Sequence, residues 1–197
     1  YHQADKAVKC GYAGVEWSDA EFSAHVDTAA GQLALLGREA KTIAPGRYRV
    51  YLAPVALADF VGMLNWGGFG LKSHRTRQSS LLRMTTDGVR LHDSVSLRDN
   101  TLDGVAPNFQ VEGFLKPDEV KLIDSGAHAD CLVSPRSARE FGVETNGAGG
   151  GEWAASLDMA PGDMAAADIL ERLGTGVWIN NLHYLNYSDR PACRITG

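Results

Sequence analysis

Histidine and carboxylate side chains are where chemistry would be expected in this chain of 197 residues, and their spacing limits what they could do together. No two of the six histidines have the spacing of a helical metal-binding pair, and no His-Glu-x-x-His motif occurs. His92 precedes Asp93, but neighbours in a strand point to opposite faces and cannot share an ion. His128 and Asp130 share a strand face, with Glu119 or a lysine opposite, an arrangement that more often marks a solvated sheet surface.

The cysteines and glycine-rich segments carry no self-contained motif either. Cys10, Cys131 and Cys193 are odd in number and lack Cys-x-x-Cys spacing, so neither a disulfide framework nor a zinc knuckle is indicated. Cys131 lies in the apolar run "DCLV", which predicts a buried small hydrophobic side chain. The loop "NGAGGG" lacks the Lys-Ser/Thr of a phosphate-binding loop, and no Gly-x-Ser-x-Gly elbow is present.

Composition narrows the function classes. The net charge of −5 and the pI near 5.6 argue against a nucleic-acid partner, which would require a basic surface. The basic stretch "KSHRTRQ" is short, and it is predicted to be a mobile, solvated loop. No apolar run approaches the roughly 20 residues of a membrane span. The cysteine usage makes a reducing cytoplasm the expected compartment.

One strand-to-helix junction has the geometry typical of a catalytic site but lacks polar side chains. The alternating run Tyr48–Leu52 predicts a strand, and a helix follows directly from Ala53, with Pro54 in its first turn. Such junctions often aim several polar side chains from one helix face. Here the positions that could hold a ligand are occupied by Ala, Pro, Val or Leu.

The elements that must position any site follow from periodicity and capping. "WSDAEFSAHVDTAAGQLALLG" predicts a helix that begins with a Ser-x-x-Glu capping box and stops at Gly37. Further helices are predicted for "RSAREF" and for "GDMAAADILERLG". Strands are predicted for "VRLHDSVSL", "NFQVEGFL", "GVWINNLHYLNY" and the hairpin "EVKLIDSGAHADCLV". Because helices and strands do not alternate strictly, we expect an α+β fold with a mostly antiparallel, barrel-like sheet and flanking helices.

The order of these fragments resembles the TldD/PmbA (TldE) family of peptidase-like proteins, once called modulators of DNA gyrase. The resemblance rests on "APGRYRVYLAPVALADFVGML", "VEGFLKPDEVKLIDSGAHADCLVSPRSAREFG", "NGAGGGEWAASLDMAPGD" and "LERLGTGVWINNLHYLNYSDRPACRITG". It implies a connecting helical segment over residues 1–41, the end of an N-terminal domain. It further implies a β-rich C-terminal domain over 42–197 that is incomplete at its end, so the chain is expected to be a fragment.

The resemblance also implies why the junction is blank. Active subunits of the family carry His-Glu-x-x-x-His on the helix after this strand, and a cysteine near the C-terminus completes a zinc site. Here Ala53, Pro54 and Ala58 stand at those positions, and none offers a lone pair to zinc. We therefore expect no metal or other cofactor in this chain, with zinc only in an active TldD-like partner. The implied role is that of a PmbA/TldE-like subunit in peptide processing, paired with that partner or with itself.

Substrate contacts are expected from the C-terminal strand and the glycine-rich loop. We predict that His183, Tyr187 and Asn146 face an extended peptide, which an antiparallel sheet can accept by strand addition. Leu182 and Tyr184 are predicted to be packed. Two alternatives stay open: an active metallopeptidase with rearranged ligands such as His92, His128 or His183, and a gyrase- or DNA-directed binding protein. A structural role for the three peptide-facing residues is equally compatible with the sequence.

Overall fold

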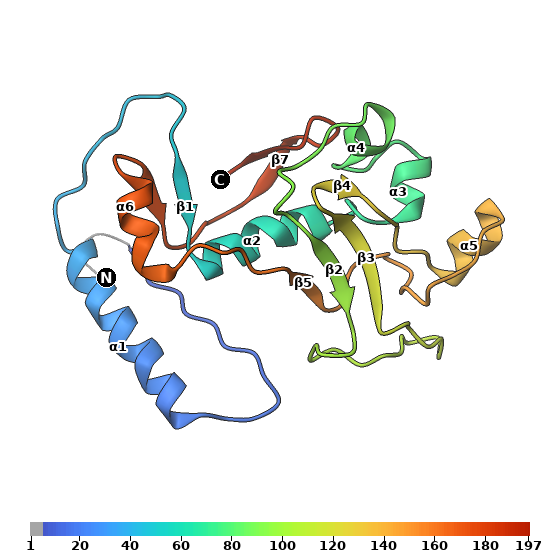
Figure 1. Ribbon diagram of the computed structural model, residues 1–197, viewed down its shortest axis with the longest axis horizontal. Helices are drawn as coiled ribbons and strands as arrows, with labels where there is room; N and C mark the ends of the chain where they lie inside the picture. Colours follow the sequence, from blue (N-terminus) through green and yellow to red (C-terminus); the bar gives the residue numbers. More distant parts are fainter. Residues whose placement is uncertain (1–5) are drawn as a thin grey trace. The chain divides into compact units, whose positions relative to one another are not determined.

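The computed structural model describes residues 6–197, which form two compact units. The first unit comprises residues 6–60 and 164–183, and the second comprises 61–163 and 184–197. Each unit is described by itself below, with the elements labelled as in Figure 1. Within the described residues, no helix combines the length and the apolar character that crossing a membrane requires.

The first unit combines a capped helix with a small parallel sheet. Helix α1 (Asp19–Leu36) begins as predicted, because the Ser18 hydroxyl accepts a hydrogen bond from the Glu21 N–H at 3.3 Å. Strand β1 pairs in parallel with β6, and helix α2 starts directly after β1. The elements of this unit after α1 are β1 (Val50–Leu52), the start of α2 (Pro54–Asn65), the 3₁₀ helix η1 (Ala166–Asp168), α6 (Ile169–Leu173) and β6 (Val177–Ile179).

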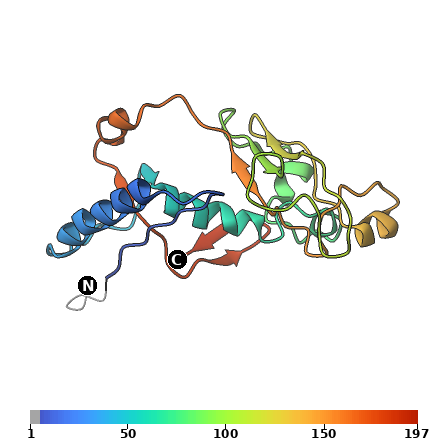
Figure 2. The same cartoon turned by 90° about the horizontal axis from the view of Figure 1, so that it is seen from below.

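The second unit is built on an antiparallel sheet with the strand order β4-β3-β2-β5 (Figures 1 and 2). Its strands are β2 (Leu97–Asn100), β3 (Glu119–Asp124), β4 (Ala127–His128) and β5 (Leu157–Met159), and a separate hairpin joins β7 (Asn186–Asp189) to β8 (Arg194–Thr196). Short helices accompany the sheet: α3 (Leu71–Arg75), α4 (Leu82–Thr86) and α5 (Pro135–Phe141). The α+β class and the mostly antiparallel pairing are confirmed. The strands over residues 6–197 do not close into a barrel, so the barrel-like description was too strong.

The core of the second unit follows from alternation along β3. Val120 and Leu122 are buried, whereas Glu119 and Lys121 are exposed, as alternation predicts. Ile123 is buried as well, although it follows Leu122 directly. The predicted hairpin after β3 is confirmed, because Ser125 and Gly126 both adopt positive φ, the conformation of a tight two-residue turn.

Three predicted strands are wrong or broken, each through a local turn. In "VRLHDSVSL" the His92 ring accepts a hydrogen bond from the Ser94 N–H, and the ladder begins only at β2. "NFQVEGFL" turns back on itself at Gly113, whose φ is +83°, and forms a single bridge. "GVWINNLHYLNY" is divided, because β6 ends at Ile179 and the chain takes positive φ at Tyr184 before β7 begins. Tyr184 is 84% exposed, so its predicted packing is wrong.

Two further segments differ in type or length. The stretch predicted as a mobile loop around Lys72–Gln78 contains α3 and leads into the buried Ser79, whose hydroxyl donates to the Gly68 carbonyl at 2.8 Å. The helix predicted from Asp163 starts only at Ala166, because the preceding backbone is extended and no side chain caps the first turn. The N-cap Ser134 and the left-handed stop at Gly142 around α5 are confirmed.

Candidate functional site

The β1–α2 junction in the first unit is supported by a backbone hydrogen bond and presents no imidazole or thiolate ligand. The Ala53 N–H donates to the Ile179 carbonyl at 2.9 Å, which fixes the start of α2 beside β6. Pro54 and Ala58 are both exposed on the helix. Asp59 is the one ionisable residue in α2. The side chains at this junction therefore offer a metal ion one carboxylate and none of the imidazole or thiolate groups that zinc prefers.

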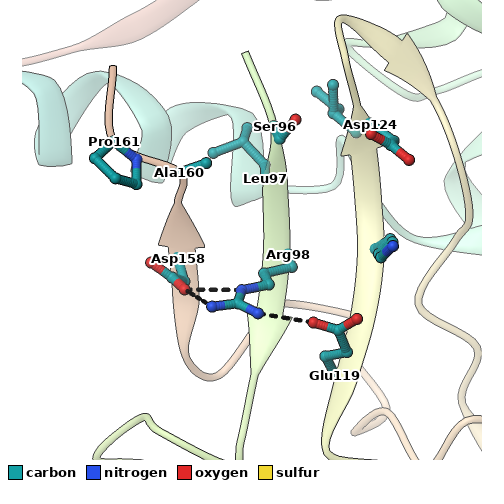
Figure 3. A pocket seen from close by; sticks show the side chains of 10 residues that line it. Ser96, Leu97, Arg98, Glu119, Asp124, Asp158, Ala160 and Pro161 are labelled. Carbon is teal, nitrogen blue, oxygen red and sulfur yellow. Dashed lines mark hydrogen bonds and ion pairs between the residues drawn. The ribbon is translucent and has the colours of Figure 1, made fainter. Parts of the chain in front are cut away.

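The second unit carries a charged pocket of about 370 Å³ on its sheet (Figure 3). Arg98, on the central strand β2, reaches both neighbouring strands. Its guanidinium bonds Glu119 on β3 at 2.8 Å and Asp158 on β5 at 2.9 Å. Hydrogen bonds from Asn100 and Arg98 lower the pKa of the Asp158 carboxyl. The pocket lining consists of Ser96, Leu97, Arg98, Glu119, Lys121, Ile123, Asp124, Asp158, Ala160 and Pro161.

The strand beside this pocket is an edge. In the described part of the chain, β5 pairs with β2 on one side and with no strand on the other. The Ala160 N–H donates to the Ser96 carbonyl, and the Ser156 carbonyl accepts from the Asn100 N–H. The backbone groups of Ser156 and Ala160 therefore face β2. By antiparallel alternation, the backbone groups of Leu157 and Met159 point to the open side. The edge thus offers backbone donors and acceptors that an extended chain could pair with.

The three residues predicted to face a peptide lie in different surroundings. The Asn146 amide uses both ends on backbone, accepting from the Val133 N–H and donating to the Cys131 carbonyl, each at 2.8 Å. The Tyr187 hydroxyl donates to the Met63 carbonyl at 2.5 Å, and burial raises the pKa of that phenol. His183 is exposed and lines a pocket of about 680 Å³ within the first unit. Their peptide-facing roles stay a prediction.

A group of potential metal ligands that the sequence analysis missed lies in the second unit. His74 on α3, His128 on β4 and Cys131 just beyond it each offer a ligand atom, and these three atoms lie within 4.8 Å of one another. The Cys131 Sγ is 3.5 Å from the His128 Nε2. The imidazole rings of His74 and His128 pack edge to face, with their centroids 5.0 Å apart. Asp130, expected to share the strand face with His128, lies instead after the end of β4. The spacing His128-x-x-Cys131 was the signal available in the sequence.

Electrostatics keep all three groups neutral. Burial lowers the pKa of His74 and of His128 below the ordinary value of 6.5. Burial above all, with smaller contributions from the nearby carboxylates of Asp130 and Glu152, raises the pKa of the Cys131 thiol to about 12. A thiol in this state is a poor nucleophile, so a Cys-His catalytic pair is not supported by the surroundings of Cys131.

Comparison with solved structures places the fold. A Thermotoga maritima protein named as a candidate modulator of a DNA gyrase is 22% identical, with a TM-score of 0.66, over 87% of this chain and 39% of its own. A Bacteroides thetaiotaomicron protein with a similar name is 16% identical, with a TM-score of 0.65, over 85% and 37%. TldE from Thermococcus kodakarensis is 15% identical, with a TM-score of 0.58, over 76% and 36%. The chain therefore spans less than two fifths of the length of each of these structures.

Sequence comparison identifies the family. No curated protein matches the chain. The family described as the PmbA/TldA metallopeptidase C-terminal domain matches residues 45–194, which is well over half of the chain. This match confirms the resemblance drawn from the sequence fragments. The chain belongs to the TldD/PmbA family and contains its metallopeptidase C-terminal domain.

Proposed function

We propose that this chain acts in peptide processing as the non-catalytic, TldE/PmbA-like partner of a zinc-dependent TldD-like subunit. The observation that carries the proposal is the β1–α2 junction. Ala53, Pro54 and Ala58 occupy the positions where the family's resemblance sets His, Glu and His, and they provide no lone pair for zinc. The likeness to a structure named TldE supports the same assignment at the level of fold.

The partner role also accounts for a sheet with an open edge. An extended peptide can bind by adding a strand to β5, because Leu157 and Met159 turn backbone groups outward. Arg98 and its two carboxylate partners lie beside that edge and would meet the side chains or the termini of the peptide (Figure 3). In this proposal the chain holds substrate, and the TldD-like subunit cleaves it.

His183 is the peptide-facing residue that we retain in the proposal, because its side chain is exposed. The contacts of Asn146 and Tyr187 with backbone carbonyls favour structural roles for those two side chains. His183→Ala should therefore weaken peptide processing by the reconstituted pair while leaving the melting temperature unchanged. His92→Ala is the matched control, since His92 is also exposed but lies in a loop of the second unit.

The experiment is co-expression of the protein, in its natural length, with a TldD-like subunit from the same source. We expect the two to copurify, and we expect peptide cleavage to require both. Asp59→Asn removes the one ionisable group of α2 and should leave both metal content and cleavage unchanged. If the chain cleaves peptides alone, and loses zinc and activity together in the Asp59→Asn variant, the non-catalytic assignment is wrong.

A further inference from the structure

The strongest unassigned group in the second unit is the cluster of His74, His128 and Cys131. Two imidazoles and one thiol are ligand types that zinc and related divalent ions prefer. They come from two separate parts of the chain, α3 on one side, and β4 with the residues just after it on the other. Two hydrogen bonds join these parts, from the Leu71 N–H to the Leu132 carbonyl and from the Leu132 N–H to the Phe69 carbonyl, both at 2.9 Å. The backbone that carries the cluster is thus tied together next to it.

The spacing fits a tetrahedral ion after a small adjustment. With metal–nitrogen and metal–sulfur distances of about 2.05 and 2.3 Å, an N···S edge of a zinc tetrahedron measures about 3.5 Å. The His128 Nε2 and Cys131 Sγ are already 3.5 Å apart. The widest separation in the group is at most 4.8 Å, so closing on an ion requires side-chain movement of about 1 Å.

His74 is held in one tautomer. Its Nε2 lies 2.8 Å from the Gly68 carbonyl, which can only accept, so Nε2 carries the proton. The Ser79 hydroxyl, which donates to the same carbonyl, lies 3.1 Å from Nε2. The lone pair of the neutral ring is therefore on Nδ1, which lies 3.3 Å from the Thr85 hydroxyl, a contact that an ion would replace. Metal-binding histidines commonly donate their second ring N–H to a backbone carbonyl in this way, which orients the ring.

The surrounding charges favour a cation. The carboxylates of Asp130 and Glu152 lie near enough to disfavour the Cys131 thiolate, and the same field attracts a positive ion. Arg75 acts in the opposite direction, but it ranks below both carboxylates in its effect on the thiol. Both imidazoles are neutral near pH 7, as metal binding requires.

We propose that His74, His128 and Cys131 form a binding site for one zinc-class divalent ion, with the fourth coordination position left to solvent or to an external ligand. Binding replaces the S–H bond of Cys131 by a metal–sulfur bond and releases one proton to solvent. The site lies in the second unit, whereas the family's zinc position at the start of α2 lies in the first. It does not depend on the proposed function. It also revises the sequence-based expectation of no metal anywhere in the chain.

Cobalt(II) is the probe for the test, because a cobalt–thiolate bond gives a charge-transfer absorption that histidine or carboxylate ligands do not give. The reduced, metal-free protein is titrated with Co²⁺, and Zn²⁺ is then added in competition. We expect one equivalent of Co²⁺ to bind with a thiolate band, and Zn²⁺ to abolish the band. Cys131→Ser should remove the band, and His128→Asn or His74→Asn should weaken binding by more than the roughly 10- to 100-fold that loss of a residue supporting a ligand costs.

Matched controls come from ligand types placed elsewhere. Cys193→Ser alters a half-buried thiol and His92→Asn an exposed imidazole, and both variants should bind like the parent protein. Circular dichroism checks folding, and Cys131→Ala, which keeps a small apolar side chain, replaces Cys131→Ser if the latter unfolds. The proposal is overturned if the parent protein shows no thiolate band, if the band survives in a folded Cys131 variant, or if Cys193→Ser removes it.

Discussion

Replacing Lys116 by Met should destabilise the second unit far more than loss of an ordinary surface charge would. The Lys116 ammonium bonds the Asp99 carboxylate at 2.8 Å, and the two side chains are 5% and 2% exposed. The other oxygen of Asp99 accepts the Ser156 N–H at 2.7 Å. The pair thus connects the loop between β2 and β3 to the place where β2 lies beside β5. Lys116→Met leaves the buried Asp99 carboxylate without its cation.

The size of the effect follows from that burial. Breaking a buried ion pair by removing one partner costs about 3–5 kcal/mol, because the remaining charge is left uncompensated. That loss corresponds to a roughly 10²- to 10⁴-fold rise in the opening equilibrium of the sheet. The double variant Asp99→Asn, Lys116→Met removes the orphaned charge, and its amide oxygen can still accept the Ser156 N–H. We therefore expect it to recover about 2 kcal/mol or more of the loss.

Hydrogen exchange of the β2 and β3 amides measures this opening without interference from the first unit. Arg83→Met is the matched control, because Arg83 and Asp87 form an exposed ion pair at 3.3 Å and should contribute less than about 1 kcal/mol. If Lys116→Met accelerates exchange no more than Arg83→Met does, the pair is not a buried support of the sheet. The same conclusion follows if the double variant exchanges as fast as Lys116→Met alone.

Three further outcomes are expected. Hydrogen bonds from Asn100 and Arg98 lower the pKa of the Asp158 carboxyl in the folded protein. The ionised carboxylate therefore stabilises the fold above the unfolded pKa of about 3.9, and this stabilisation is lost as the pH falls below that value. Asp158→Asn should accordingly show a smaller drop in melting temperature than the parent protein between about pH 5 and pH 3. Because burial raises the pKa of Cys131 to about 12, iodoacetamide at pH 8 should leave this thiol unmodified while an exposed cysteine reacts, as mass spectrometry of the digested protein would report. Gly126→Ala should lower the free energy of unfolding in urea by about 1–3 kcal/mol, because φ is +79° there and the added methyl group would collide with the Leu91 carbonyl oxygen.

Local signals in the sequence predicted the capped elements well. The Ser18 N-cap, the hairpin turn at Ser125 and Gly126 and the Gly142 helix stop all rest on short-range backbone chemistry, and the structure contains each of them. Strand boundaries were harder to predict, because Tyr184 takes a positive φ that its residue type does not announce.

The candidate sites could be predicted only in part, since a site depends on long-range contacts. The blank junction at Ala53 is local, and the sequence alone identified it. The cluster joins His74 to Cys131 across 57 positions of the chain, through a helix in a segment that was predicted to be a loop. Periodicity carries no information about which distant segments meet, so His74 could not be paired with Cys131 in advance.

The two hydrogen bonds between the Asn146 side chain and the backbone of Cys131 and Val133 affect how readily this asparagine deamidates. Asn-Gly is the dipeptide at which asparagine most readily loses ammonia, through attack of the glycine nitrogen on the side-chain amide. Here the Gly147 N–H donates to the Thr145 hydroxyl at 3.1 Å, and the Asn146 amide is held at both ends. Folded protein should therefore resist deamidation at a bond where the unfolded chain would react first. Slow conversion to aspartate during storage would report how often this loop opens.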